Sequence, residues 1–208
     1  MSIKTNALIY FLAFCSGFCI MGIELLGGRI LAPYFGSSVH IWGSIITVFM
    51  LSLSLGYLLG GKLSTKNASL TKYGLIFLVA SIMVVPIALF SQPIMEFIFT
   101  HIEAYAGNFL LASTALFLFL PSYFRHDLAL LSVRLLVTDS HKSGQVAGVL
   151  YFVSTLGSAL GTIITSFYFV LAFDVNTIIS AFASTLGLLG VLAITVNSLG
   201  GNKELAHA

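Results

Sequence analysis

Residues 41–66 read IWGSIITVFMLSLSLGYLLGGKLSTK, a long apolar run that is followed directly by two lysines. A helix needs about 20 mainly apolar residues to cross the hydrocarbon core of a bilayer. Residues 41–61 supply that length without a charged side chain. The stretch therefore predicts a transmembrane helix that ends on a positively charged side of the membrane.

The composition of the whole chain is also that of a membrane protein. Of its 208 residues, 58% are hydrophobic and only 8% are charged, whereas charged residues make up about a quarter of an ordinary soluble domain. The net charge of +2 is small and dispersed over the connections, which excludes a nucleic-acid-binding surface. We therefore predict one all-α polytopic membrane domain over residues 1–208, with the lipid bilayer as its solvent.

Six apolar runs of sufficient length follow one another with short connections. We place the spans at about 7–28, 41–61, 73–91, 108–126, 146–171 and 177–197. Each is expected to be helical, because backbone N–H and C=O groups inside hydrocarbon must pair within their own segment. Residues 29–40 are expected to lie in the outer interface. Residues 128–137 are expected either as a helix along the inner face or as an extension of the fourth span.

The basic residues predict the orientation of these spans. Eight of the nine Lys and Arg residues lie in alternate connections or near the two termini: Lys4, Lys62, Lys66, Lys72, Arg125, Arg134, Lys142 and Lys203. The connection 91–107 and the turn near Asp174 and Asn176 carry none. Because positively charged connections face the cytoplasm, both termini are predicted inside, in the inner membrane of a bacterium.

An internal similarity relates the second and fifth spans. Residues 43–61 and 144–162 share six identities without a gap, and each copy carries a G-x-x-x-G pair. The similarity predicts an inverted three-plus-three repeat, as in transporter halves, although chance matches between Gly-rich and Leu-rich helices are the alternative. Small residues let helices approach closely, so spans two and five are expected to form the packed centre of the bundle through Gly56, Gly60, Gly157, Gly161, Ser154 and Ser158.

The polar residues at the outer end of the first span are candidates for a solute site. Glu24 lies inside that span, and Arg29 is the basic residue outside the charge pattern. A carboxylate in hydrocarbon is costly unless it is neutralised, paired or hydrated, so an intramembrane acid is a functional candidate. We expect Glu24 to bind a cation or proton, Arg29 to tune it, and Tyr34, His40 and Trp42 to complete a vestibule. In the structural alternative, Glu24 pairs with Arg29 or a hydroxyl, and the aromatic residues anchor the interface.

A second polar group lies at the inner end of the fourth span. Arg125, His126 and Asp127 are consecutive, and Arg134 follows about two helical turns later. A histidine beside an acid is able to relay protons, but a solvated helix end is the favoured interpretation. The chain has no common catalytic, metal-binding or nucleotide-binding motif. We therefore predict no catalytic residue, no metal and no cofactor.

Two blocks of the sequence are distinctive when they are read in order. Residues 22–63 read GIELLGGRILAPYFGSSVHIWGSIITVFMLSLSLGYLLGGKL, and residues 144–171 read GQVAGVLYFVSTLGSALGTIITSFYFVL. Together they resemble the membrane half of bacterial proteins in which a multi-span region is fused to a spermidine-synthase-like aminopropyltransferase domain. Residues 60–66 are also similar to a loop of major facilitator transporters, whose half likewise has six helices. The chain lacks the aminopropyltransferase part, and Thr65 and residues 125–127 depart from these patterns.

Three functions follow as expectations. The first is a transporter-half-like module that handles a small polar or cationic solute. It would act as a homo-oligomer or with a protein partner, because alternating access generally needs two halves. The second is a membrane anchor that docks a separately encoded enzyme on its cytoplasmic face. The third is an intramembrane enzyme that uses Glu24 or the pair His126 and Asp127.

Overall fold

The computed structural model describes residues 3–64, 69–102, 131–137 and 143–205. These ranges are helical and contain no strand. The elements are α1 (Ile3–Phe35), α2 (Val39–Ser64), α3 (Leu70–Ile102), α5 (Ser143–Ile164), η2 (Thr165–Phe169), α6 (Val170–Ala172) and α7 (Val175–Leu205); residues 131–136 form one further short helix. Within the described residues, five helical segments are long and apolar enough to cross a membrane. The predicted helical membrane class is therefore confirmed.

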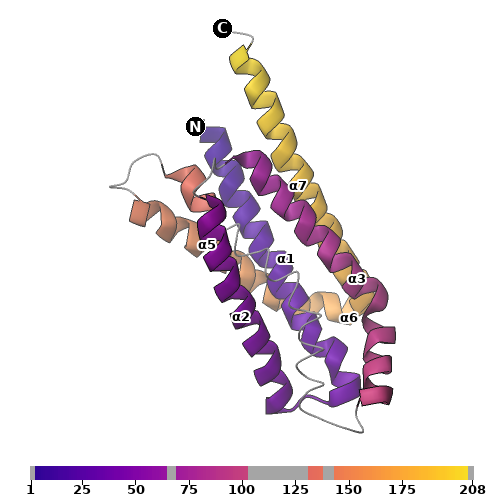
Figure 1. Cartoon of the computed structure of the whole chain (residues 1–208). Coiled ribbons are helices and arrows are strands. Elements are labelled where there is room, and N and C mark those ends of the chain that lie inside the picture. Colours follow the sequence, from indigo (N-terminus) through magenta and orange to yellow (C-terminus); the bar gives the residue numbers. More distant parts are fainter. Residues whose placement is uncertain (1–2, 65–68, 103–130, 138–142, 206–208) are drawn as a thin grey trace.

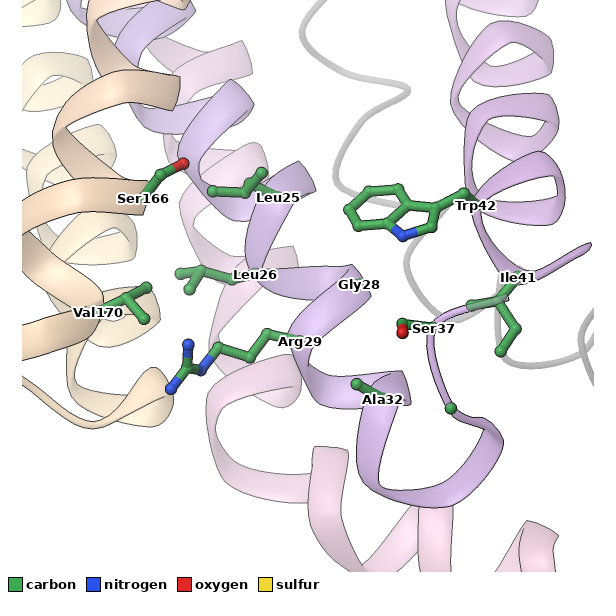
Figure 2. Close-up of a pocket in the computed structure, with 11 residues that line it drawn as sticks. Leu25, Leu26, Gly28, Arg29, Ala32, Ser37, Ile41, Trp42, Ser166 and Val170 are labelled. Atoms are coloured by element: carbon green, nitrogen blue, oxygen red, sulfur yellow. The ribbon is translucent and has the colours of Figure 1, made fainter. Parts of the chain in front are cut away.

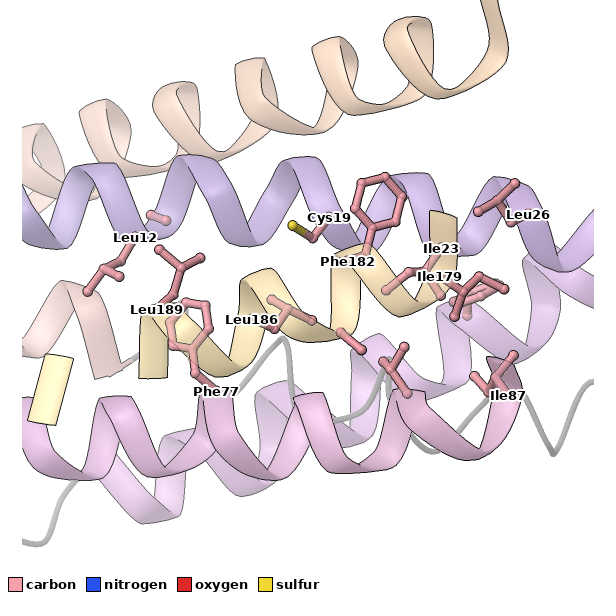
Figure 3. Packing of buried hydrophobic residues seen from close by; sticks show 14 of the residues in the cluster. Leu12, Cys19, Ile23, Leu26, Phe77, Ile87, Ile179, Phe182, Leu186 and Leu189 are labelled. Carbon is pink, nitrogen blue, oxygen red and sulfur yellow. The ribbon is translucent and has the colours of Figure 1, made fainter. Parts of the chain in front are cut away.

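The described helices form two packed pairs that share a core (Figure 1). α3 and α7 lie antiparallel along most of their length, and α5 packs along α1. α7 also contacts α1 and so joins the two pairs. Figure 3 shows Leu186 and Leu189 of α7 between α1 and α3, where they meet Phe77 and other buried apolar side chains. α2 lies beside α1, its main contact within the described part of the chain.

The first helix is longer than the first predicted span. α1 continues to Phe35, so residues 29–35 extend the helix, and their expected place in the outer interface stays a prediction. The helix continues because Ile30 and Leu31 are buried against the core. Pro33 is tolerated in the last turn, where it removes only one main-chain hydrogen bond. The chain then reverses at Gly36, whose φ of 77° lies in the left-handed region that favours glycine.

The third helix also extends past its predicted end. We expected a connection from residue 91, but α3 runs to Ile102 with Pro86 and Pro93 inside it. Met95 and Ile98 are buried, and this continued burial holds the extra turns in place. The fifth predicted span is continuous through α5, η2 and α6, and the predicted turn at Asp174 separates it from α7. The fourth predicted span, 108–126, lies outside the described residues.

The glycine pair of α5 packs against α1, not against α2. A Cβ atom at Gly157 would collide with the main-chain oxygen of Phe14, and one at Gly161 would collide with that of Phe18. Gly17 of α1 approaches Ser154 and Ser158 in the same way. The close contact at these small residues of α5 is thus made with α1, and the expected central position of spans two and five stays a prediction. Within α2, Gly56 and Gly60 are buried.

Candidate functional site

Two cavities meet at Arg29, near the C-terminal end of α1. The first, of about 270 Å³, lies between α1, the start of α2 and the turn formed by η2 and α6. The second, of about 530 Å³, is lined by α1, α3 and the first residues of α7. Arg29 and Ala32 line both cavities. Because α1 continues as a helix past residue 28, it carries these two side chains, one turn apart, between both cavities.

The first cavity is mainly apolar. Its walls include Leu25, Leu26 and Val170, and its polar groups other than Arg29 are two serine hydroxyls and the indole N–H of Trp42. The hydroxyl of Ser166 already donates a hydrogen bond of 2.7 Å to the carbonyl of Thr162. Figure 2 shows the Arg29 side chain directed toward Val170 and away from the indole that closes the opposite wall. A ligand in this cavity would therefore meet mainly apolar walls and few hydrogen-bonding groups.

The wall opposite Arg29 in the first cavity is the indole of Trp42. A Cβ atom at Gly28 would lie 2.8 Å from the ring atom Cη2 of Trp42. The absence of a side chain at Gly28 therefore lets the indole lie directly on α1. Trp42 is the single tryptophan of the chain, and it lies on Gly28, the residue that precedes Arg29 on α1.

The second cavity is more polar, and its lining contains one cation and no acid. The polar members are Arg29, Tyr34, Ser91, Gln92 and Asn176. The Ser91 side chain is 1% exposed, and its hydroxyl has no hydrogen-bond partner among the described residues. α7 begins at Val175, so the first N–H groups of that helix, which have no intrahelical acceptor, belong to this wall.

The aromatic wall of the second cavity is fixed by its neighbours. The ring of Tyr34 packs on those of Phe35 and Phe99, with centroid separations of 6.4 and 6.1 Å. Its hydroxyl also lies 3.5 Å from the carbonyl oxygen of Gln92, a long contact that adds little energy. The ring contacts therefore hold this wall in place.

The structure divides the predicted vestibule. Arg29 shares the first cavity with Trp42 and the second with Tyr34. Glu24 is half-buried and His40 is exposed, and neither residue lines these two cavities. Glu24 and Arg29 are five positions apart, which places them about 140° apart around a helix. The two side chains therefore lie on different faces of α1, and neither of these two cavities brings them together.

The inner polar cluster is described only in part. Arg125, His126 and Asp127 lie outside the described residues, while Arg134 is exposed on the short helix 131–136. That helix is attached to the start of α3, because the buried hydroxyl of Ser132 donates a hydrogen bond of 2.8 Å to the hydroxyl of Tyr73. Arg134 therefore lies at the opposite end of the bundle from Arg29. In the described part of the chain, no group of three or more His, Cys, Asp and Glu side chains is placed to hold a metal ion.

Sequence reasoning missed Ser91, Gln92 and Asn176. A signal was present at the first two positions, since a Ser-Gln pair interrupts an apolar run that resumes after Pro93. Sequence reasoning also missed the π-helical turn η2, which contains Thr165. The Thr165 side chain is 0% exposed, and its hydroxyl has no hydrogen-bond partner in the described ranges. Turns of this kind are frequent near functional sites.

No family model, curated protein or solved structure matches this chain. The resemblance to the membrane half of the spermidine-synthase-like fused proteins therefore stays a prediction. The chemistry available at the two cavities rests on the residues that line them, of which Arg29 is the charged one.

Proposed function

We propose that this protein is a solute-binding module of the bacterial inner membrane, built like half of a transporter, and that it takes a small polar solute at Arg29. One observation carries this proposal: a single cationic side chain stands between two cavities of about 270 and 530 Å³. No ion pair joins Arg29 to another described residue. A cation near a membrane is tolerated when it reaches water or an anionic partner, and a solute in either cavity would supply such a partner.

The directions of the described helices support six spans. Tyr73 is near the start of α3 and accepts the hydrogen bond from Ser132. Ile102, at the other end of α3, is about 43 Å along the helix from Tyr73 at a rise of about 1.5 Å per residue. Residues 102 and 132 therefore lie at opposite ends of the bundle. This separation is compatible with the proposed fourth span, which lies outside the described residues.

The distribution of charge supports termini on the cytoplasmic side. Thr71 accepts a hydrogen bond of 2.8 Å from Asn197 near the end of α7, and the N-terminus of α1 lies at the same end of the bundle (Figure 1). Lys72 and Arg134 belong to this end as well. The end that holds Arg29 and the turn at Gly36 is then the outer one, in agreement with the positive-inside rule.

The packing of α3 on α7 is compatible with the proposed inverted repeat, although the third and sixth spans of any six-span chain run in opposite directions. In such a repeat the third and sixth spans are equivalent and run in opposite directions. The two helices are in fact antiparallel, with Gly74 close to Gly190 and the Ser81 hydroxyl donating a hydrogen bond of 2.7 Å to the carbonyl of Ala183. A single six-helix half lacks a second half to move against. We therefore propose that the protein acts as a dimer or with a membrane partner.

The test is whether the protein retains a solute through Arg29. Purified full-length protein in nanodiscs is incubated with the small-molecule fraction of a bacterial extract, and the retained compounds are identified by mass spectrometry. The wild type and the Arg134→Gln control should retain the same compound, and Arg29→Gln should lose it. Retention of nothing, or equal retention by all three proteins, would refute the proposal. A stoichiometric soluble enzyme found in place of a solute would instead favour the anchoring function.

A further inference from the structure

We propose that the larger cavity binds an oxyanion, a carboxylate or a phosphate group, between Arg29 and the N-terminus of α7. This inference rests on the proposed function and names the chemical class of its ligand. It also departs from the sequence-based expectation of a cationic solute, because the acid on which that expectation depends, Glu24, does not line this cavity.

The charge of the cavity lining selects the sign of the ligand. Arg29 is the charged residue among the nine that line it. Glu96 and Asp174 are the nearest acids along α3 and the start of α7, and both are exposed and outside the lining. A guanidinium presents its N–H donors in a planar fork that matches the two oxygens of a carboxylate or phosphate. A cationic ligand would meet this charge without a compensating carboxylate.

The N-terminus of α7 adds a second source of positive potential. The first N–H groups of a helix lack intrahelical acceptors, and the aligned peptide dipoles place about half a positive charge at this end. The N–H of Ile178 already donates to the carbonyl of Asp174 at 3.1 Å. Val175 and Asn176 precede it and line the cavity. Their main-chain donors therefore belong to the same wall as the guanidinium.

The buried hydroxyl of Ser91 is an independent observation that points to a ligand. Its side chain is 1% exposed, and its oxygen has no hydrogen-bond partner among the described residues. An unpaired buried polar group costs about 1–3 kcal/mol, so native structures rarely keep one without a reason. Ser91 is part of the cavity wall, and an oxyanion in the cavity would be the acceptor that its hydroxyl lacks. The amides of Gln92 and Asn176 add further donors.

The experiment uses full-length protein in uncharged detergent, with acetate, inorganic phosphate and tetramethylammonium as probes at constant ionic strength. Binding is followed by the emission of Trp42, the single tryptophan, and by thermal unfolding. Acetate or phosphate should bind saturably, and tetramethylammonium should not. Arg29→Gln should weaken binding about 10- to 100-fold, since hydrogen bonds to charged groups are among the stronger ones. Arg134→Gln, at the other end of the bundle, should leave binding unchanged.

Two further variants separate loss of binding from loss of folding. Ser91→Ala removes one neutral donor and should weaken binding about 3- to 10-fold. Arg29→Lys keeps the charge but loses the planar fork, so its affinity should lie between those of the wild type and Arg29→Gln. A variant counts only if its unfolding transition without probe is cooperative, and Arg29→Lys provides the comparison if Arg29→Gln does not fold.

A lipid headgroup could supply the same oxyanion, and nanodiscs distinguish the two sources. If phosphatidylglycerol stabilises the wild type relative to phosphatidylcholine, and Arg29→Gln removes the effect, the inference stands with a lipid phosphate as the ligand. It is overturned if acetate, phosphate and phosphatidylglycerol all act equally on wild type and Arg29→Gln. If the compound retained through Arg29 from the extract is a cation, the proposed function stands and this inference fails.

Discussion

The glycine contact between α1 and α5 gives a stability prediction that the structure makes quantitative. At Gly161, an added Cβ atom would collide with the main-chain oxygen and Cα of Phe18. These are backbone atoms, so no side-chain rotation relieves the collision, and the two helices must separate. At Gly148, on the same helix, an added Cβ meets nothing within 4 Å. Gly161→Ala and Gly148→Ala therefore make the same chemical change in two different environments.

The comparison of these variants isolates the packing energy. Replacing glycine by alanine inside a helix stabilises it by about 0.5–1 kcal/mol, and this gain applies to both positions. Overpacking a close contact costs about 1–3 kcal/mol, and this cost applies only at Gly161. We therefore expect Gly161→Ala to be less stable than Gly148→Ala by about 1–3 kcal/mol. For a chain of this length, each kcal/mol corresponds to about 2–4 °C in Tm.

The assay is thermal unfolding in detergent, followed by the reaction of a thiol-specific fluorophore with the free cysteines. Cys15 and Cys19 both lie on α1, and Cys19 is buried, so they react as that helix loses its neighbours. Gly148→Ala should unfold at or above the wild-type temperature, and Gly161→Ala at a lower one. Equal unfolding temperatures for the two variants would refute the proposed α1–α5 contact and the conclusion that α5 packs on α1.

Three other predictions follow from single features of the fold. In a cysteine-free background, Ser37→Cys should react with an impermeant maleimide in intact cells and Val137→Cys only after permeabilisation; the reverse pattern would contradict the proposed orientation. Tyr73→Phe removes the buried hydrogen bond from Ser132, so unfolding should need about 1 kcal/mol less free energy, and an unchanged Tm would show that the short helix 131–136 is not attached there. Gly36→Ala should lower stability by about 1–2 kcal/mol, because φ is 77° and no neighbour within 4 Å adds a steric effect; calorimetry without a loss would mean that the turn adopts another conformation.

The class of fold was predictable from the sequence, but the helix ends were not. The predicted spans and their orientation depend on properties that each segment carries by itself, namely its length, its polarity and its charge, as at Lys72 and Arg134. The ends at Phe35 and Ile102 depend on burial against other helices, which a hydropathy pattern does not contain. Residues 29–35 are polar enough to resemble a connection, but Ile30 and Leu31 pack into the core and keep the helix intact.

The choice of packing partner shows the same limit. The G-x-x-x-G pattern of Gly157 and Gly161 indicates that another backbone approaches α5 closely. It does not indicate which one, because the contact depends only on the absence of a side chain. The partner proves to be α1, at Phe14 and Phe18.

The sequence indicated Arg29 as a candidate site residue, but it did not indicate which other residues line the two cavities. Arg29 was visible because it breaks the charge pattern. Glu24 and Arg29 lie on different faces of α1 only because this helix continues through residue 29, since the angle between the two side chains follows from helical geometry. Ser91 and Asn176 are 85 positions apart in the sequence, and they share a cavity because α3 and α7 pack antiparallel. That pairing is a property of the tertiary structure and is absent from either segment alone.

The position of the first cavity follows from the way in which the α1–α5 contact ends. The close contacts at glycines of α1 continue to Gly22, where an added Cβ would lie 2.5 Å from the ring of Phe182 on α7 and 2.9 Å from the hydroxyl of Thr165. The π-helical turn begins at that threonine, and the next residue, Ser166, already lines the cavity together with Leu25. Gly157 and Gly161 thus hold α5 close to α1, and the first cavity begins beyond this contact, at Ser166.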